Sequence, residues 1–160
     1  MKYEFIKTDT KQLGAITLYR IRALVAIGSF VSAGDLGGYV QMEGNLSQQG
    51  NAWVYGNAWV SGNAWVSGNA RVYGNAWVSG NARVADQKTW LSIGPAKSSG
   101  RFTTAFVDKE IGVCVVCGCF TGSVLEFSQQ IEKTHANNKE ALEQYRLFCQ
   151  LIAFNFGVTT

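Results

Sequence analysis

Between Gly37 and Val84, apolar and polar positions repeat with a period of six residues. The unit reads Val-x-Gly-Asn-Ala-x, and its glycines keep one unbroken phase, at Gly38, Gly44, Gly50, Gly56, Gly62, Gly68, Gly74 and Gly80. Alanine and valine stand two residues apart, as two inward-facing neighbours on a β-strand do. The residue between them is therefore predicted to point outward. Glycine and asparagine are predicted to form the corner, because both tolerate a positive φ.

A period of six predicts a parallel β-solenoid of the hexapeptide type. A short solenoid exposes unpaired backbone at both ends, so flanking segments should cover them. The first units fit less well, because Val40 and Leu46 stand in place of alanine and Gln48 in place of valine. We expect Gln48 to lie at an end of the solenoid or to be hydrogen-bonded within a looser coil.

The segment before the repeat predicts a β-hairpin. Residues 2–8 and 15–25 are rich in strand-forming residues, and residues 9–14 between them read as a polar turn. A two-stranded hairpin is only marginally stable by itself, so this one is expected to cap the first coil.

The segment after the repeat predicts three strands and two helices. The strands are expected at residues 90–93, 101–107 and 111–120. Ser123 and Glu126 have the spacing of a capping box, which opens a helix that continues to Thr134. Asn138 caps a second helix that ends near Phe154. The segment is thus predicted to be a β-β-β-α-α module.

These patterns predict a mainly β fold in three parts. An N-terminal hairpin and cap spans residues 1–36, a hexapeptide-repeat parallel β-helix spans residues 37–86, and an α+β module spans residues 87–160. The apolar fraction of 47% and the charged fraction of 16% are those of a globular chain that can build a core.

The hexads from Val54 to Val84 resemble those of the hexapeptide acyltransferase superfamily, which share the pattern aliphatic-x-x-x-small-x. That resemblance implies a left-handed β-helix in which three hexads close one triangular coil of about 18 residues. Nearly the whole chain also resembles a group of phage and prophage hexapeptide-repeat proteins of unknown function, on Arg20–Leu24, Ala33–Val40, Cys117–Gly122 and Thr134–Lys139. The second resemblance implies a phage or prophage origin, and with it interference with a host process such as an immune protein or its nucleotide signal.

The outward positions of the hexads carry the candidate binding site. The residues between alanine and valine, together with two tyrosines that follow valine, are Trp53, Tyr55, Trp59, Trp65, Arg71, Tyr73, Trp77 and Arg83. A coil of the implied length places Trp59 over Trp77, Trp53 over Arg71, Trp65 over Arg83 and Tyr55 over Tyr73. A tryptophan stacked with an arginine is a cation–π pair, which contributes about 0.5–1 kcal/mol when exposed.

Stacked aromatic side chains form a larger apolar patch than monomers usually expose, so something is expected to cover them. A homotrimer is one covering, because proteins that resemble this class usually assemble that way. A small planar ligand is a second, and a host protein is a third, since Trp, Tyr and Arg dominate interface energetics. The three are compatible, because a trimer forms clefts between its subunits.

Acyl transfer is the alternative function. The hexapeptide acyltransferases use a histidine as general base and an acyl-CoA-type thioester as donor. The one histidine of this chain, His135, falls between the two predicted helices and outside the hexads. We expect His135 to be a helix-flanking residue bonded to the backbone, and we predict a binding protein rather than an enzyme.

A metal site formed by Cys114, Cys117, Cys119 and His135 is a further possibility. Residues three apart on a strand point to opposite faces, so Cys114 and Cys117 should diverge. We therefore predict buried cysteines, without a metal or another cofactor.

The net charge of +3 is spread evenly along the chain, so no nucleic acid partner is expected. The first residues lack the apolar core of a secretion signal, and no apolar run approaches the roughly 18 residues of a membrane span. The expected location is the cytoplasm of the host cell, away from the membrane.

Overall fold

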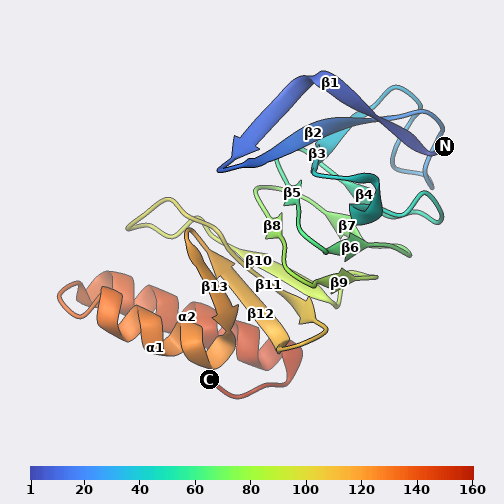
Figure 1. Ribbon diagram of the computed structural model, residues 1–160. Helices are drawn as coiled ribbons and strands as arrows, with labels where there is room; N and C mark the ends of the chain where they lie inside the picture. Colours follow the sequence, from blue (N-terminus) through green and yellow to red (C-terminus); the bar gives the residue numbers. More distant parts are fainter. The chain divides into compact units, whose positions relative to one another are not determined.

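In the computed structural model, which describes residues 1–160, each late hexad contributes a two-residue strand to the solenoid (Figure 1). These strands are β4 (Trp53–Val54), β5 (Trp59–Val60), β6 (Trp65–Val66), β7 (Arg71–Val72), β8 (Trp77–Val78) and β9 (Arg83–Val84). They pair in parallel, β4 with β7, β5 with β8 and β6 with β9. Residues 18 apart are neighbours in adjacent coils, as the Asn51–Asn69 hydrogen bond also shows. Three hexads therefore complete one coil.

The predicted inward positions are confirmed. Their exposed fractions are 1% or less at every alanine and valine of the six hexads, namely Ala52, Val54, Ala58, Val60, Ala64, Val66, Ala70, Val72, Ala76, Val78, Ala82 and Val84. Each hexad turns one small and one branched side chain inward, and the valines lie beside their counterparts in the next coil.

Only half of the corner prediction is confirmed. The six glycines from Gly50 to Gly80 have φ between 57° and 71°, but no asparagine has a positive φ. The asparagine side chains bond between coils instead. Nδ2 of Asn51 donates to Oδ1 of Asn69 at 3.2 Å, and Nδ2 of Asn63 donates to Oδ1 of Asn81 at 3.3 Å. Asparagine thus contributes an amide ladder along two of the corners.

The unbroken phase predicted for the first two units is wrong. Strand β3 (Leu36–Val40) pairs with β5 so that Val40 lies beside Val60, and a bridge joins Leu46 to Val66. Both residues therefore occupy valine rows, two residues out of phase with the later coils. Gly38 takes the small-residue position, because a Cβ there would lie 2.6 Å from the carbonyl oxygen of Ala58.

The N-terminal hairpin forms, but its turn lies later than predicted. Strands β1 (Tyr3–Leu13) and β2 (Ile16–Ala23) are antiparallel and meet at Gly14, whose φ is 58°. The predicted polar turn at residues 9–14 is mostly strand, with a register shift between Ile6 and Thr10. Strand β2 pairs with β3, so one sheet runs in the order β1-β2-β3-β5-β8 and joins the hairpin to the solenoid.

Two polar side chains fasten the hairpin to the first coil. Nζ of Lys2 donates to the carbonyl oxygen of Ala52 at 2.8 Å, and its backbone N–H donates to Oε1 of Gln48 at 2.7 Å. Oη of Tyr3 donates to the carbonyl oxygen of Leu46 at 2.8 Å. Gln48 is therefore hydrogen-bonded, but to the N-terminal segment and not within a coil as expected.

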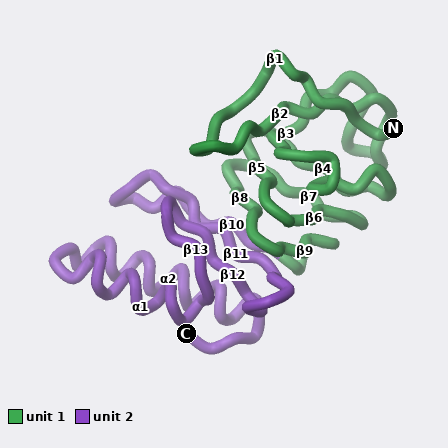
Figure 2. The backbone as a smooth tube through the Cα atoms, in the orientation of Figure 1, with its two compact units in different colours: residues 1–89 green, residues 90–160 purple.

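The chain divides into two units, residues 1–89 and 90–160 (Figure 2). The second unit has a four-stranded antiparallel sheet, with β10 (Trp90–Ile93), β11 (Thr103–Asp108), β12 (Gly112–Cys117) and β13 (Phe120–Ser123) in sequence order. The single strand predicted at residues 111–120 is wrong, because a turn at Gly118, with φ of 60°, splits it. The module is therefore β-β-β-β-α-α.

Helices α1 (Val124–Thr134) and α2 (Lys139–Phe156) begin where the sequence predicts. The Ser123–Glu126 capping box forms, and Oδ1 of Asn138 accepts from the backbone N–H of Ala141 at 3.0 Å. Both helices contribute to one core with the sheet, formed by Ala96, Ala105, Val113, Val115, Val124, Phe127, Ile131, Tyr145, Cys149 and Ile152.

Candidate functional site

The outward side chains of the solenoid form three rows, and the row on β4 and β7 is largely covered by the chain itself. Trp53 is 1% exposed, and its ring meets the ring of Tyr3 edge-on at 6.3 Å between centroids. The expectation that Trp53 belongs to an open surface is wrong, because the N-terminal segment packs over it. Arg71 is half-buried, with Cζ 3.6 Å from the ring centroid of Phe30.

Tyr55 and Tyr73 follow the valines of the same row. Tyr55 is half-buried, and burial raises the pKa of its hydroxyl. Tyr73 is 55% exposed. These two tyrosines therefore sit at the border between covered and open solenoid surface.

The second row, on β3, β5 and β8, is aromatic along its whole length. Trp59 and Trp77 are neighbours in adjacent coils, with ring centroids 5.9 Å apart and an interplanar angle of 64°. Tyr39 continues the row beyond Trp59 but is only 5% exposed, so Trp59 and Trp77 are the accessible part of the row. Sequence reasoning missed Tyr39 because the two-residue phase shift hides its equivalence to Trp59.

A charged group borders this second row. Nζ of Lys11 lies 5.0 Å from the ring centroid of Tyr39 and 5.8 Å from that of Trp59. The hydroxyl of Tyr39 accepts from Nη1 of Arg20 at 3.0 Å and donates to Oδ1 of Asp9 at 2.9 Å. Arg20 and Asp9 also form an ion pair with each other, with Nε and Oδ2 3.8 Å apart. Aromatic rings beside the cation of Lys11 are components that can hold a planar, charged ligand.

The third row, on β6 and β9, holds Trp65 and Arg83. Trp65 is 47% exposed. Nη1 of Arg83 donates to the carbonyl oxygens of Asn63 at 2.8 Å and Ala82 at 3.0 Å. The predicted stacking of arginine on the tryptophan one coil away is wrong in both rows, since Arg83 turns to the backbone and Arg71 to Phe30. The pairing of the strands that carry these residues is as predicted.

His135 ends helix α1 in the second unit. Its backbone N–H donates to the carbonyl oxygen of Ile131 at 2.9 Å, and its ring stacks on Tyr145 at 5.0 Å with an interplanar angle of 14°. The hydroxyl of Tyr145 bonds Oγ of Ser99 at 2.9 Å. The helix-flanking position predicted for His135 is confirmed, but its ring stacks on Tyr145 where a hydrogen bond to the backbone was expected.

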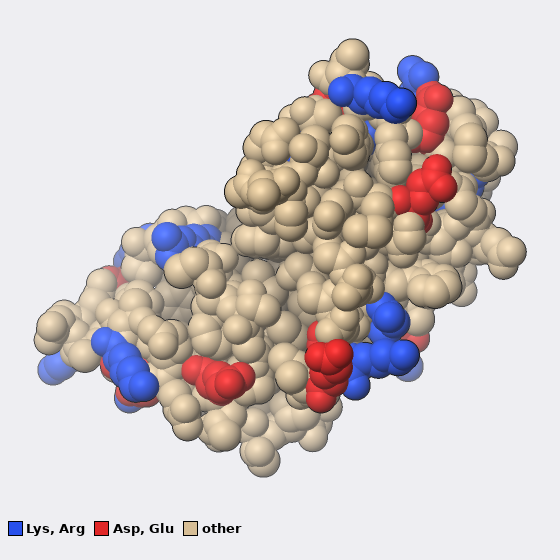
Figure 3. All heavy atoms as spheres, viewed as in Figure 1, with Lys and Arg blue, Asp and Glu red and all other residues tan.

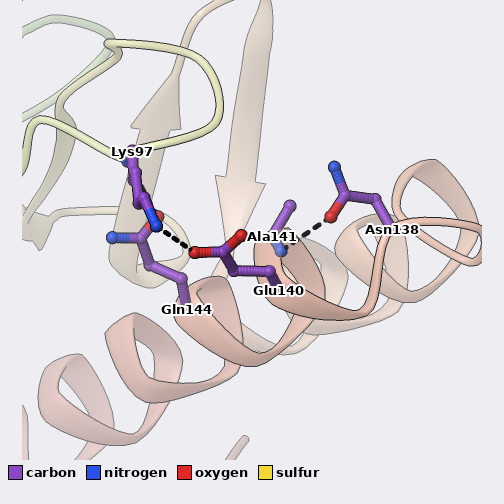
Figure 4. A network of polar contacts seen from close by, with 5 residues as sticks. All are labelled: Lys97, Asn138, Glu140, Ala141 and Gln144. Atoms are coloured by element: carbon purple, nitrogen blue, oxygen red, sulfur yellow. Dashed lines mark hydrogen bonds and ion pairs between the residues drawn. The ribbon is translucent and has the colours of Figure 1, made fainter.

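A polar network joins the loop after β10 to the start of α2 (Figure 4). Lys97 forms an ion pair with Glu140, and its backbone N–H donates to Oε1 of Gln144 at 2.9 Å. This network links the loop that also carries Ser99 to helix α2, which carries Tyr145.

The sheet separates Cys114 from Cys117 and Cys149. Cys117 packs against the core on the helix side, and Cys114 lies on the opposite side of the strand, as the spacing predicts. The prediction of buried cysteines is wrong for Cys119, which is exposed because it lies in the turn between β12 and β13. Cys149 is buried in the helix-side core. No three His, Cys, Asp or Glu side chains come together in an arrangement that could hold a metal ion.

We expect iodoacetamide at mildly alkaline pH to modify Cys119 in the native protein and to leave Cys114 and Cys149 intact. Burial raises the pKa of both buried thiols to about 11, so they are protonated as well as inaccessible. Peptide mass spectrometry reports the sites, and urea-unfolded protein, in which all are modified, is the control. Fast native modification of Cys149 would contradict its place in the core.

Charged side chains on the visible face form small separate groups of both signs (Figure 3). This distribution agrees with the even charge of the sequence. Neither helix has the length and apolar character needed to cross a membrane.

Comparison with protein families adds one finding. Residues 52–68 and 64–80 each match the model described as the YdcK beta solenoid repeat. No curated protein matches this chain in sequence. The matched segments contain strands β4 to β8, so the family model and the strand pairing identify the same hexads. Residues 52–80 are therefore a YdcK-type beta-solenoid repeat region.

Proposed function

We propose that this chain is a non-enzymatic binding protein whose solenoid is a left-handed β-helix that presents aromatic rows to a partner. The partner is a host protein or a small planar ligand. The proposed assembly is a homotrimer, which repeats each row three times around an axis. A phage or prophage origin and a place in the host cytoplasm complete the proposal, and they rest on the sequence resemblance alone.

The observation that carries this proposal is the pair Trp59 and Trp77, which are partly exposed and lie in adjacent coils of the second row. Val60 and Val78, the neighbours of the two tryptophans, are fully buried, so the packed interior fixes the strands that carry the indoles. Aromatic anchors held in place before binding lose little conformational entropy when a partner arrives. The row therefore has the rigidity and the chemistry of an interface centre.

The composition of the hexads supports binding over catalysis. From Ala52 to Val84 there is no Asp, Glu, His, Lys or Cys. The titratable residues of that stretch are tyrosines and arginines. The side chains that most often serve as a general base are therefore missing from these hexads.

Substitution of the second row tests the proposal. We expect Trp59→Ala and Trp77→Ala each to dissociate the oligomer or to abolish partner capture while the circular dichroism of the protein stays unchanged. Light scattering and pull-down from host lysate report the two outcomes. Leu147→Ala is the matched control, because it removes an apolar side chain that is 54% exposed on α2.

If both tryptophan variants keep the mass and the partners of the wild type, the second row is inert and the proposal fails.

The alternative function, acyl transfer, predicts different results. It requires binding of acetyl-CoA in calorimetry and loss of acetyl transfer in His135→Ala. Saturable acetyl-CoA binding together with that loss would favour catalysis over binding.

A further inference from the structure

A cavity of about 490 Å³ opens beside Trp65, away from the second row. The short helix η1 (Glu43–Asn45) forms part of its wall. Its lining combines one indole, one carboxylate and three polar side chains with a buried leucine, and consists of Glu43, Gly44, Leu46, Ser47, Gln48, Gln49 and Trp65. An aromatic face beside a carboxylate is the combination that recognises an organic cation.

The indole of Trp65 is accessible from this cavity. The side chain is 47% exposed. Arg83, the nearest candidate for a cation–π pair, donates to the carbonyl oxygen of Asn63 and does not stack on the Trp65 ring. The negative face of an indole attracts a guanidinium or an ammonium group within about 6 Å of its centroid. The ring can therefore take a cation from outside the chain.

The carboxylate of Glu43 supplies the opposite charge. Glu43 is exposed, and none of the salt bridges of the structure includes it. The η1 backbone is held at its C-terminal end. Oη of Tyr3 donates to the carbonyl oxygen of Leu46 at 2.8 Å, and Nδ2 of buried Asn45 donates to that of Ala64 at 2.8 Å. Glu43 is thus an unpaired acid on a fixed segment beside an open indole.

We propose that this cavity binds the guanidinium group of an arginine side chain presented by the partner. The planar guanidinium would stack on Trp65 and donate to the carboxylate of Glu43. The proposal rests on the binding function proposed above, and it adds a second contact of different chemistry on another row of the solenoid.

Nuclear magnetic resonance of the indole N–H groups tests this site directly. The probe is N-acetylarginine methylamide, with the citrulline analogue as the neutral control of the same shape. We expect the arginine probe to shift the Trp65 indole signal, which Trp65→Phe identifies, and the citrulline probe to leave it unmoved. Equal shifts from both probes, or none from either, would overturn the proposal.

Substitution of Glu43 provides a second test of the arginine site. Loss of one exposed charge pair predicts that Glu43→Gln weakens arginine binding about two- to fivefold. Glu110→Gln, the same change at an exposed acid of the second unit, should leave the affinity unchanged. An unchanged affinity in Glu43→Gln, or an equal loss in Glu110→Gln, would overturn the role of Glu43.

The outcome separates this site from the function proposed for the second row. If the arginine probe fails while Trp59→Ala still loses the partner, only the Trp65 site is refuted. If the probe binds while Trp59→Ala and Trp77→Ala change nothing, the Trp65 site stands and the function of the second row is refuted.

Discussion

Gly68→Ala should lower the free energy of unfolding of the solenoid by several kcal/mol, whereas Gly74→Ala should lower it by only about 1–2 kcal/mol. Both glycines are left-handed, with φ of 60° and 71°, so both substitutions carry the same backbone strain. A Cβ at Gly68 would also lie 2.6 Å from the carbonyl oxygen of Ala85, whereas a Cβ at Gly74 meets nothing within 4 Å. The difference between the variants measures how closely the coils approach.

Urea unfolding followed by circular dichroism measures both free energies. Gly74→Ala is the matched control, because it occupies the equivalent corner position of the following hexad. Equal losses in the two variants would mean that backbone strain alone matters at these corners. The carbonyl oxygen of Ala85 would then lie farther from Gly68 than it does in the structure.

Trp53→Ala is the second substitution with a large expected effect. Removing a fully buried indole leaves a cavity between the first coil and Tyr3, and such truncations cost about 3–5 kcal/mol. Trp65→Ala removes the same atoms from a side chain that is 47% exposed, so it should cost far less. The two residues occupy the same hexad position, which makes Trp65→Ala the control for Trp53→Ala.

Thermal unfolding of the two variants against the wild type separates these effects. A midpoint lowered strongly in Trp53→Ala and slightly in Trp65→Ala is the expected result. If Trp53→Ala unfolds like the wild type, Trp53 is not part of the core. The prediction that it lies on an open binding surface would then be supported.

The inward rows of the solenoid could be predicted because each hexad specifies its own geometry. Alternating alanine and valine fix which side chains point inward, and the glycine corners follow from a positive φ that only glycine adopts here. The helix starts at Ser123 and Asn138 could be predicted for the same reason, since a cap is a contact within a few residues.

The repeat pattern alone does not distinguish the open rows of the solenoid from the covered row. Trp53, Trp59 and Trp65 have the same hexad context, and their different exposures depend on the N-terminal segment. Tyr3 reaches Trp53 from 50 residues away in the chain, and no periodicity within the hexads encodes that contact. The predicted site therefore contained one core residue.

Two further predictions were wrong because a stretch of sequence with a uniform pattern hides a change in the structure. The glycines at Gly38 and Gly44 keep the period of six by coincidence, which concealed the phase shift and the place of Tyr39 in the second row. The apolar run from Ile111 to Phe120 reads as one strand, although Gly118 turns the chain between β12 and β13.

Native mass spectrometry of the wild type and of a Trp59→Ala, Trp77→Ala double variant tests the proposed binding function most directly. Both proteins are taken after incubation in host lysate, and unfolding curves establish that the variant is folded. The proposal predicts a wild-type trimer that retains a protein or a small ligand, and a folded variant that loses the assembly, the bound partner or both. A wild type that stays a monomer without a bound partner at micromolar concentration, with an indistinguishable variant, would contradict it.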